Sequence, residues 1–192
     1  DVTLLTPIYL GTRQLNLREV RNVKTPADLK GVKLRMPGSK EWLFLGEALG
    51  ATATPLAFGE VYLGLKTGTI DGQDNPLPSV RAAKFYEVTK QIVMTNHLVD
   101  GIFIAISDKA WKAMTPAQPA AVQAAADAAA AFNNDNRIKE EAQIVDFLKK
   151  EGLTVTTPDV EAFRKSVQAA YATSDMAKAW PAGLLDRINN TK

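Results

Sequence analysis

Residues 25–37 read TPADLKGVKLRMP, and this stretch decides the expected fold. Thr25 is a good helix N-cap, and Pro26 at the first helical position favours a short helix that Gly31 ends. Residues 32–36 then predict a strand, which Pro37 ends. A short helix that leads directly into a strand is typical of an α/β unit.

The same alternation continues on both sides of this stretch. Ser39 caps an expected helix that runs to Leu49 and stops at Gly50. A short extended piece, a helix and a strand follow at residues 53–55, 58–66 and from Ile70. Strands are also expected at residues 2–9, 91–94, 98–106 and 153–156, and a helix at residues 160–171. Short connections between these pieces predict an α/β domain with a largely parallel sheet.

Residues 115–150 predict one very long helix. Its apolar stripe of alanines is interrupted by the polar segment 133–136 and resumes at Val145 and Leu148. A helix with a polar middle and two apolar ends is expected to bridge two packing units. A kink or break at the polar segment is the alternative.

Composition excludes several classes of protein. The 192 residues are 46% hydrophobic and 23% charged, as in globular proteins, and 23 Lys and Arg against 21 Asp and Glu leave a net charge of +2. This small excess without a basic block does not indicate nucleic-acid binding. The absence of cysteine and the single histidine, His97, exclude disulfides, thiolate nucleophiles and multi-histidine metal sites, so no cofactor or metal is expected.

Membrane and targeting segments are not expected. No apolar run approaches the roughly 20 residues that cross a bilayer. The apolar stretch 2–10 lacks a cationic start and contains Pro7, which indicates an extended entry strand and not a signal peptide.

Two arginines are candidates for binding an anion. Arg35 closes the strand over 32–36, and ligands of open α/β sheets bind beyond the carboxyl ends of strands. A guanidinium there can hold a carboxylate through two parallel N–H donors. Arg13 follows the first strand and could make a second contact to a carboxylate or hydroxyl group. A solvated surface arginine is the alternative in both cases.

The densest polar cluster is DGQDNP at residues 71–76. The Asn75 amide can donate and accept hydrogen bonds, which suits a hydroxylated ligand. A turn is the alternative, since Asp-Gly and Asn-Pro are turn dipeptides. Asp71 and Asp74 could serve acid–base chemistry, but no nucleophile accompanies them. Phe58 is expected in the core, and His97 in the core or a loop.

Five segments in order resemble the substrate-binding proteins of tripartite ATP-independent periplasmic (TRAP) transporters. They are TPADLKGVKLRMP (25–37), LGATATPLAFGEVY (49–62), LKTGTIDGQDNPL (65–77), KFYEV (84–88) and MTNH (94–97). Together they cover most of residues 9–111. The resemblance implies a two-lobed periplasmic receptor that closes on an organic anion and delivers it to the membrane permease subunits.

The resemblance also implies roles for individual residues. Arg35 would clamp the carboxylate, Asn75 would contact the ligand and Phe58 would line the pocket. Arg13, in a G-T-R-Q segment typical of members that bind sialic acid and sugar acids, would add a contact, and His97 would lie near the cleft. Asp74 is also a candidate ligand-binding residue, and it stands where the family usually has a glutamate.

Family members carry on the order of a hundred further residues before the G-T-R-Q segment, a typical domain size. The resemblance therefore implies that the N-terminal part of the first lobe is missing here. Residues 1–98 with 141–192 would form the second lobe. Residues 99–140 would be a crossover strand and helix belonging to the incomplete first lobe.

Three functions are weighed on this basis. The leading one is a periplasmic receptor, not an enzyme, for a sugar acid, sialic acid or similar carboxylate. The second is an α/β enzyme that uses Asp71, Asp74 or His97. The third is a truncated lobe that binds no ligand and forms a homodimer through its uncovered apolar face, which would include Ile102 and Ile104.

Overall fold

A six-stranded sheet organises the chain in the computed structural model, which describes residues 1–191. Its strand order is β3-β2-β4-β1-β5-β6. The strands are β1 (Val2–Leu17), β2 (Lys33–Met36), β3 (Thr52–Pro55), β4 (Gly72–Pro76), β5 (Gln91–Ser107) and β6 (Thr154–Thr156). The α-helices are α1 (Lys40–Ala48), α2 (Val61–Thr67), α3 (Leu77–Ala82), α4 (Asp108–Lys112), α5 (Gln118–Lys150), α6 (Val160–Ala172) and α7 (Leu184–Asn189). Short 3₁₀ turns are η1 (Pro26–Leu29), η2 (Phe58–Glu60), η3 (Phe85–Glu87) and η4 (Ala177–Ala179).

The α/β class is confirmed, and the sheet is mixed. β2 pairs in parallel with β3 and β4, and β5 pairs in parallel with β6. β1 is antiparallel to both of its neighbours, β4 and β5. The expected parallel pairing therefore holds for the βαβ units, whose helices return the chain to the same end of the sheet. It does not hold for β1, which runs in the opposite direction through the middle of the sheet.

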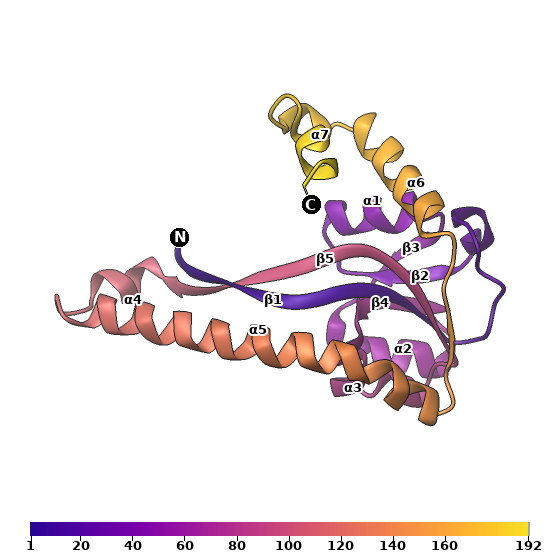
Figure 1. Cartoon of the computed structure of the whole chain (residues 1–192), viewed down its shortest axis with the longest axis horizontal. Helices are drawn as coiled ribbons and strands as arrows, with labels where there is room; N and C mark the ends of the chain where they lie inside the picture. Colours follow the sequence, from indigo (N-terminus) through magenta and orange to yellow (C-terminus); the bar gives the residue numbers. More distant parts are fainter. Residues whose placement is uncertain (192) are drawn as a thin grey trace.

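β1 and β5 are much longer than the other strands and extend beyond the sheet as a two-stranded ribbon (Figure 1). We call residues 2–10 and 99–107 the ribbon. β5 is a single strand where the sequence predicted two. Its register with β1 shifts between Leu15↔Val93 and Arg13↔Leu98, so residues 94–97, which include Asn96 with a φ of 46°, form an irregular stretch between the two predicted strands. Ile102 and Phe103 on the ribbon are 43% and 56% exposed.

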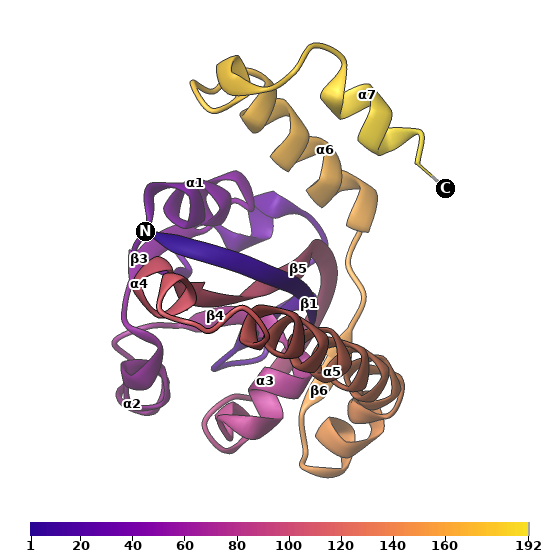
Figure 2. The same cartoon turned by 90° about the vertical axis from the view of Figure 1, so that its left-hand side faces the viewer.

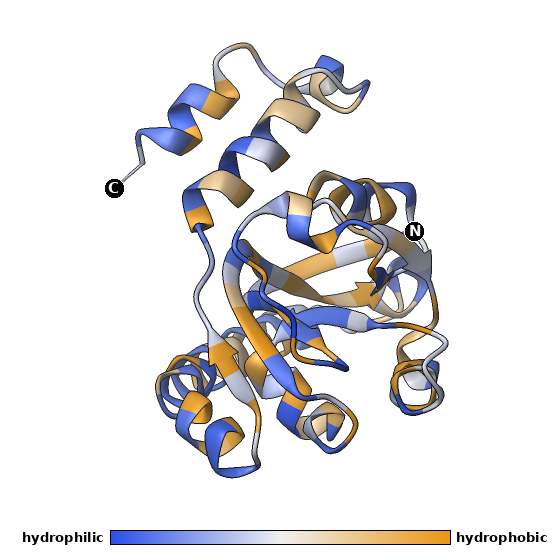
Figure 3. Ribbon diagram, turned by 90° about the vertical axis from the view of Figure 1, so that its right-hand side faces the viewer, coloured by the Kyte–Doolittle hydropathy of each residue, from blue (hydrophilic) through white to orange (hydrophobic). Residues whose placement is uncertain are grey.

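Two hydrophobic cores lie on opposite faces of the sheet. One joins Leu15, Leu34 and Met36 to Leu45 of α1 and Phe163 of α6, and we call this side the α1 face. The other joins α2, α3 and the C-terminal part of α5, and we call this side the α3 face. Figure 2 shows α1 on one side of the sheet and α2 and α3 on the other, and Figure 3 shows apolar residues concentrated in the strands between them.

The long helix is confirmed as α5, which runs unbroken through its polar segment. Ala126 and Ala130 are buried on its N-terminal half, while Ile144 and Leu148 are buried in the core on the α3 face. The alternative of a break at residues 133–136 is wrong. Among the residues that the structure describes, no helix is both long enough and apolar enough to span a bilayer.

Gly50 ends α1 as the sequence predicted, and its replacement tests that stop. Its φ is +91°, and a Cβ would press against the backbone carbonyl of Pro26. We expect Gly50→Ala to lower the free energy of unfolding by about 2–5 kcal/mol, from left-handed backbone strain plus steric overlap. Gly31 has a φ of +80° with open space around it, so Gly31→Ala should cost only about 1–2 kcal/mol. Urea unfolding of both variants measures the difference, and equal losses would contradict the packing argument.

Candidate functional site

Arg35 is a buried cation whose terminal nitrogens are free. The residue is 4% exposed, so the alternative of a solvated surface arginine is wrong. Its Nε donates to the Leu56 carbonyl at 2.8 Å, and its guanidinium carbon lies 5.9 Å from the Phe58 ring centre. Its Nη1 and Nη2 atoms make no hydrogen bond to any residue within 1–191. The two outer donors of the guanidinium therefore remain available to an anion.

Burial lowers the pKa of Arg35 below its ordinary value, the nearby charge of Asp74 opposes this, and the like charge of Arg13 adds to it. Taking a guanidinium out of water is unfavourable unless it is paired and hydrogen-bonded. The outer nitrogens of Arg35 are not fully buried, so an anionic group can reach them and complete the pairing of the guanidinium. The site is thus electrostatically suited to a carboxylate.

Asn75 lies on the same face of the sheet as Arg35. Gln73 is paired with Arg35 across β2 and β4, and Asn75 is two residues further along β4. The Asn75 amide nitrogen donates to Gln73 Oε1 at 2.6 Å, and Gln73 in turn donates to Asn16 Oδ1 at 3.2 Å. These two hydrogen bonds fix the Asn75 side-chain amide. They leave its side-chain oxygen, Oδ1, without a donor among the described residues. That oxygen can accept a hydrogen bond from a hydroxyl group.

Segment 71–76 is not a turn. Residues 72–76 form β4 in the middle of the sheet, and all five are buried. The local dipeptides favour a turn, but pairing of β4 with β1 and β2 satisfies the backbone, and the side chains of Gln73, Asp74 and Asn75 find polar partners. Tertiary hydrogen bonds therefore overrode the local preference.

Arg13, Asp74 and His97 form a cluster on the α1 face. Arg13 Nε donates to Asp74 Oδ2 at 2.6 Å, its Nη2 donates to the Asp74 carbonyl at 2.6 Å, and its Nη1 donates to Asp100 Oδ2 at 2.6 Å. The Arg13 guanidinium also stacks 4.4 Å from the Trp42 ring centre. Arg13 and Asp74 are 3% and 0% exposed, so this is a buried ion pair.

His97 completes the cluster. Its Nε2 lies 3.1 Å from Asp74 Oδ2, and its Nδ1 lies 2.7 Å from the Thr95 hydroxyl. Both ring nitrogens are satisfied when Nε2 carries the proton and the Thr95 hydroxyl donates to Nδ1. Burial raises the pKa of Asp74, but the His97 hydrogen bond and the charge and hydrogen bonds of Arg13 outweigh it and lower the pKa to about 2.

The structure thus brings the six predicted residues together around the end of β4, in two groups on opposite faces. Arg35, Asn75 and the half-exposed Phe58 present free polar or apolar groups. Arg13, Asp74 and His97 are bonded to one another. The backbone between the groups is shared, because Asp74 directly precedes Asn75 and its carbonyl is held by Arg13.

Several neighbours in the site were not predicted, among them Gln73, Trp42 and Asp100. Gln73 lies in the polar cluster 71–76, between the candidates Asp71 and Asp74, and this position could have suggested a role in binding. Trp42 and Asp100 carry no local signal, because each reaches Arg13 from a distant segment.

The arrangement offers little for catalysis. The Asp74 carboxylate is engaged by Arg13 and His97, and Asp71 accepts the backbone N–H of Lys33 at 2.9 Å. Within the described part of the chain, no cluster of three or more His, Asp or Glu side chains could hold a metal ion. The site is therefore better suited to binding than to proton transfer.

Comparison with known proteins places the chain among solute-binding proteins. Residues 1–178 match the family model described as bacterial extracellular solute-binding protein, family 7. The sialic acid-binding periplasmic protein SiaP of Vibrio cholerae is 38% identical over 167 residues, which is 87% of this chain and 51% of that protein. The 2,3-diketo-L-gulonate-binding periplasmic protein YiaO of Escherichia coli is 35% identical over 144 residues, 73% of this chain and 44% of that protein.

Among solved structures, a TRAP periplasmic solute-binding protein from Roseobacter denitrificans is similar throughout. That crystal structure contains bound 3-deoxy-D-manno-oct-2-ulosonic acid (KDO). The two chains are 51% identical with a TM-score of 0.94, and the match covers 98% of this chain and 63% of the other. This chain therefore spans about half the length of the two relatives above and less than two thirds of this one.

Removal of the Asp74 charge tests the buried ion pair. At pH 7, Asp74→Asn should lower the free energy of unfolding by about 3–5 kcal/mol, because Arg13 loses its principal counter-charge. The native pKa of about 2 lies below the usual 3.8, so the wild-type contribution is complete above pH 3.8 and is lost as the pH falls towards 2. The difference in the free energy of unfolding between the wild type and Asp74→Asn should therefore become smaller as the pH falls from 3.8 towards 2.

Urea unfolding at a series of pH values measures this difference. Asp146→Asn, which removes an exposed carboxylate on α5, is the control and should match the wild type. A constant difference between pH 7 and pH 2 would contradict the assignment of the depressed pKa to Asp74.

Proposed function

This chain belongs to family 7 of the bacterial extracellular solute-binding proteins, and we propose that it provides the carboxylate-binding half of a receptor for an organic acid. The single observation that carries the proposal is the buried guanidinium of Arg35 with two free terminal nitrogens. The family is one of transport proteins and not of enzymes, and its members are extracellular or periplasmic.

In this proposal Arg35 binds the ligand carboxylate through Nη1 and Nη2. Each charged hydrogen bond is worth about 1.5–3 kcal/mol, so the pair dominates recognition. The free carbonyl oxygen of Asn75 accepts a ligand hydroxyl, and the half-exposed Phe58 ring covers an apolar side of the ligand.

Arg13, Asp74 and His97 act as positioning residues in the same proposal. The Arg13 guanidinium is already engaged by Asp74 and Asp100, and His97 by Asp74 and Thr95. Their role is to hold the end of β4, and with it Asn75, in place. This differs from the expectation that Arg13 and His97 contact the ligand directly.

The ligand class we propose is an acidic sugar. The similar Roseobacter protein was solved with bound KDO, and the Vibrio relative is a sialic acid-binding protein. Residues 1–98 with 141–192 would form one lobe, and residues 99–140 would contribute to a second lobe that closes over the ligand. The closed receptor would deliver the acid to the permease subunits of a TRAP transporter in the periplasm.

Binding of KDO by isothermal titration calorimetry tests the role of Arg35. We expect Arg35→Ala to weaken binding at least 100-fold, which corresponds to about 3 kcal/mol, because two charge-assisted hydrogen bonds are lost. Asn75→Ala should weaken it about 5–10-fold, as expected for one neutral hydrogen bond. Arg81→Ala, which removes a half-exposed arginine that pairs with Glu140, is the matched control and should bind as the wild type does.

Retained affinity in Arg35→Ala would overturn the proposal. The apolar side chains exposed on the ribbon favour a second candidate, a lobe that associates with another copy through that face. A dimer by light scattering together with no binding of KDO, sialic acid or a C4-dicarboxylate would favour that candidate.

A further inference from the structure

Four hydrogen bonds join α5 to one short stretch of β1, two from the polar segment 133–136 and two from Glu141. The Tyr9 N–H donates to Asn134 Oδ1 at 2.8 Å, and Asn133 Nδ2 donates to the Tyr9 carbonyl at 2.9 Å. The Tyr9 hydroxyl donates to Glu141 Oε2 at 2.6 Å, and the Thr12 N–H donates to Glu141 Oε1 at 2.7 Å. The interruption of the apolar stripe of α5 thus coincides with a specific contact to the strand.

β1 is irregular at this same point. Its register with β5 shifts between Tyr9 and Gly11, and Gly11 has a φ of +133°. A Cβ at Gly11 would stand 2.6 Å from both Glu141 Oε1 and the Cβ of Pro76. The bulge therefore brings the backbone of β1 against the Glu141 carboxylate and against the residue that follows Asn75.

The contact lies between two regions that are held by apolar packing. On one side of it, Ala126 and Ala130 are buried where α5 runs alongside the ribbon. On the other side, Ile144 and Leu148 are buried in the core of the α3 face. At the junction itself the helix and strand meet through hydrogen bonds, which can break and re-form with water, whereas interdigitated apolar packing resists displacement.

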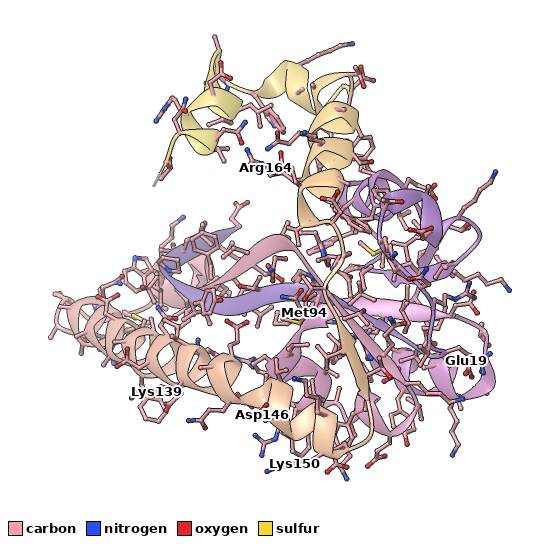
Figure 4. All side chains as sticks on the ribbon, turned by 45° about the vertical axis from the view of Figure 1, so that its right-hand side comes forward. Glu19, Met94, Lys139, Asp146, Lys150 and Arg164 are labelled. Carbon is pink, nitrogen blue, oxygen red and sulfur yellow. The ribbon has the colours of Figure 1, made fainter. Side chains whose placement is uncertain are left out.

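Within the described residues, Glu141 is a carboxylate without a cationic partner. Between residues 1 and 191 its hydrogen bonds are to neutral donors, the Tyr9 hydroxyl and the Thr12 N–H. The pKa of the Tyr9 hydroxyl is raised, mainly by burial and secondly by the hydrogen bond to Glu141. The hydroxyl therefore stays protonated and remains a donor. Glu140, the residue before it, instead pairs with Arg81. Figure 4 labels Lys139 and Asp146, which lie on either side of Glu141 along the same helix.

A cavity of about 190 Å³ adjoins the carboxylate. It is lined by Thr12, Gln14, Leu77, Met94, Asn96 and Glu141. Figure 4 labels Met94 within the sheet beside α5. The cavity leaves open space beside the Glu141 carboxylate and the start of α3 at Leu77.

We propose that Glu141, Tyr9 and the Thr12 N–H form a latch that fixes the angle between the ribbon and the sheet. The latch is a positioning device: it touches no ligand, but it holds Gly11 against Pro76, next to the proposed ligand contact Asn75. Its effect on ligand affinity rests on the proposed function, whereas its effect on the ribbon angle does not.

Distances within the ligand-free chain test the latch directly. The sequence contains no cysteine, so Lys33→Cys on β2 and Lys112→Cys on α4 can carry spin labels without background. Both positions are exposed. Double electron–electron resonance should give one narrow distance distribution with the native latch. Glu141→Ala and Tyr9→Phe should at least double its width or shift its centre, and Glu141→Gln, which keeps an acceptor for the Thr12 N–H, should fall between.

Glu140→Ala removes the neighbouring carboxylate from the same helix and should leave the distribution unchanged. If Glu141→Ala does not fold, Tyr9→Phe, which deletes one oxygen, decides the question. Lowered melting temperatures in the latch variants with unchanged distance distributions would overturn the latch, because they would indicate stabilisation without control of the angle.

Titration with KDO separates the latch from the proposed function. We expect Glu141→Ala and Tyr9→Phe to weaken binding about 5–20-fold, while Glu140→Ala binds as the wild type does. Native affinity in a variant whose distance distribution has broadened would overturn the link between ribbon angle and binding. Failure of the wild type to bind KDO would overturn the proposed ligand, and the distance measurements would still decide whether the latch exists.

Discussion

Arg13 of β1 and Asp74 of β4 form an ion pair that is almost fully excluded from water. Each charge would be strongly destabilising without the other, so the pair permits one alignment of the two antiparallel strands. That alignment places Gln14 opposite Asn75 and turns Gln73 and Asn75 towards the α3 face. Other alignments of β1 would separate the two charges.

The two buried arginines illustrate how one residue type serves two purposes. The Arg13 guanidinium donates to Asp74 and Asp100, so it organises the strands. The Arg35 guanidinium donates only through Nε, to Leu56, and its outer nitrogens stay free within the described chain. The outer nitrogens of Arg35 are not fully buried, so an anion can reach them. In the proposed function, an acid is recognised because Arg35 is incompletely paired while Arg13 is fully paired.

The ends of two helices and the α/β class were correctly predicted from local sequence features. Gly31 and Gly50 adopt positive φ where the sequence predicted that helices end, and α5 follows the predicted long helix. Local chemistry misled at residues 71–76, where turn dipeptides form a buried strand because polar partners from β1 and β2 satisfy it. It also predicted two strands where β5 is one, although the pairing of β5 with β1 is irregular over residues 94–97, where the predicted gap lies.

By itself the sequence determined the α/β class, most of the strands and helices, the family and the short set of residues around the end of β4, because caps, periodicity and motif spacing are local properties of the chain. Only the tertiary structure decided that Arg13 and Arg35 lie on opposite faces, that Trp42 and Asp100 complete the Arg13 cluster, and that Glu141 meets β1 at the Gly11 bulge. These pairings join residues from about 30 to 130 positions apart, and which of them form depends on strand direction and register, which no local pattern encodes.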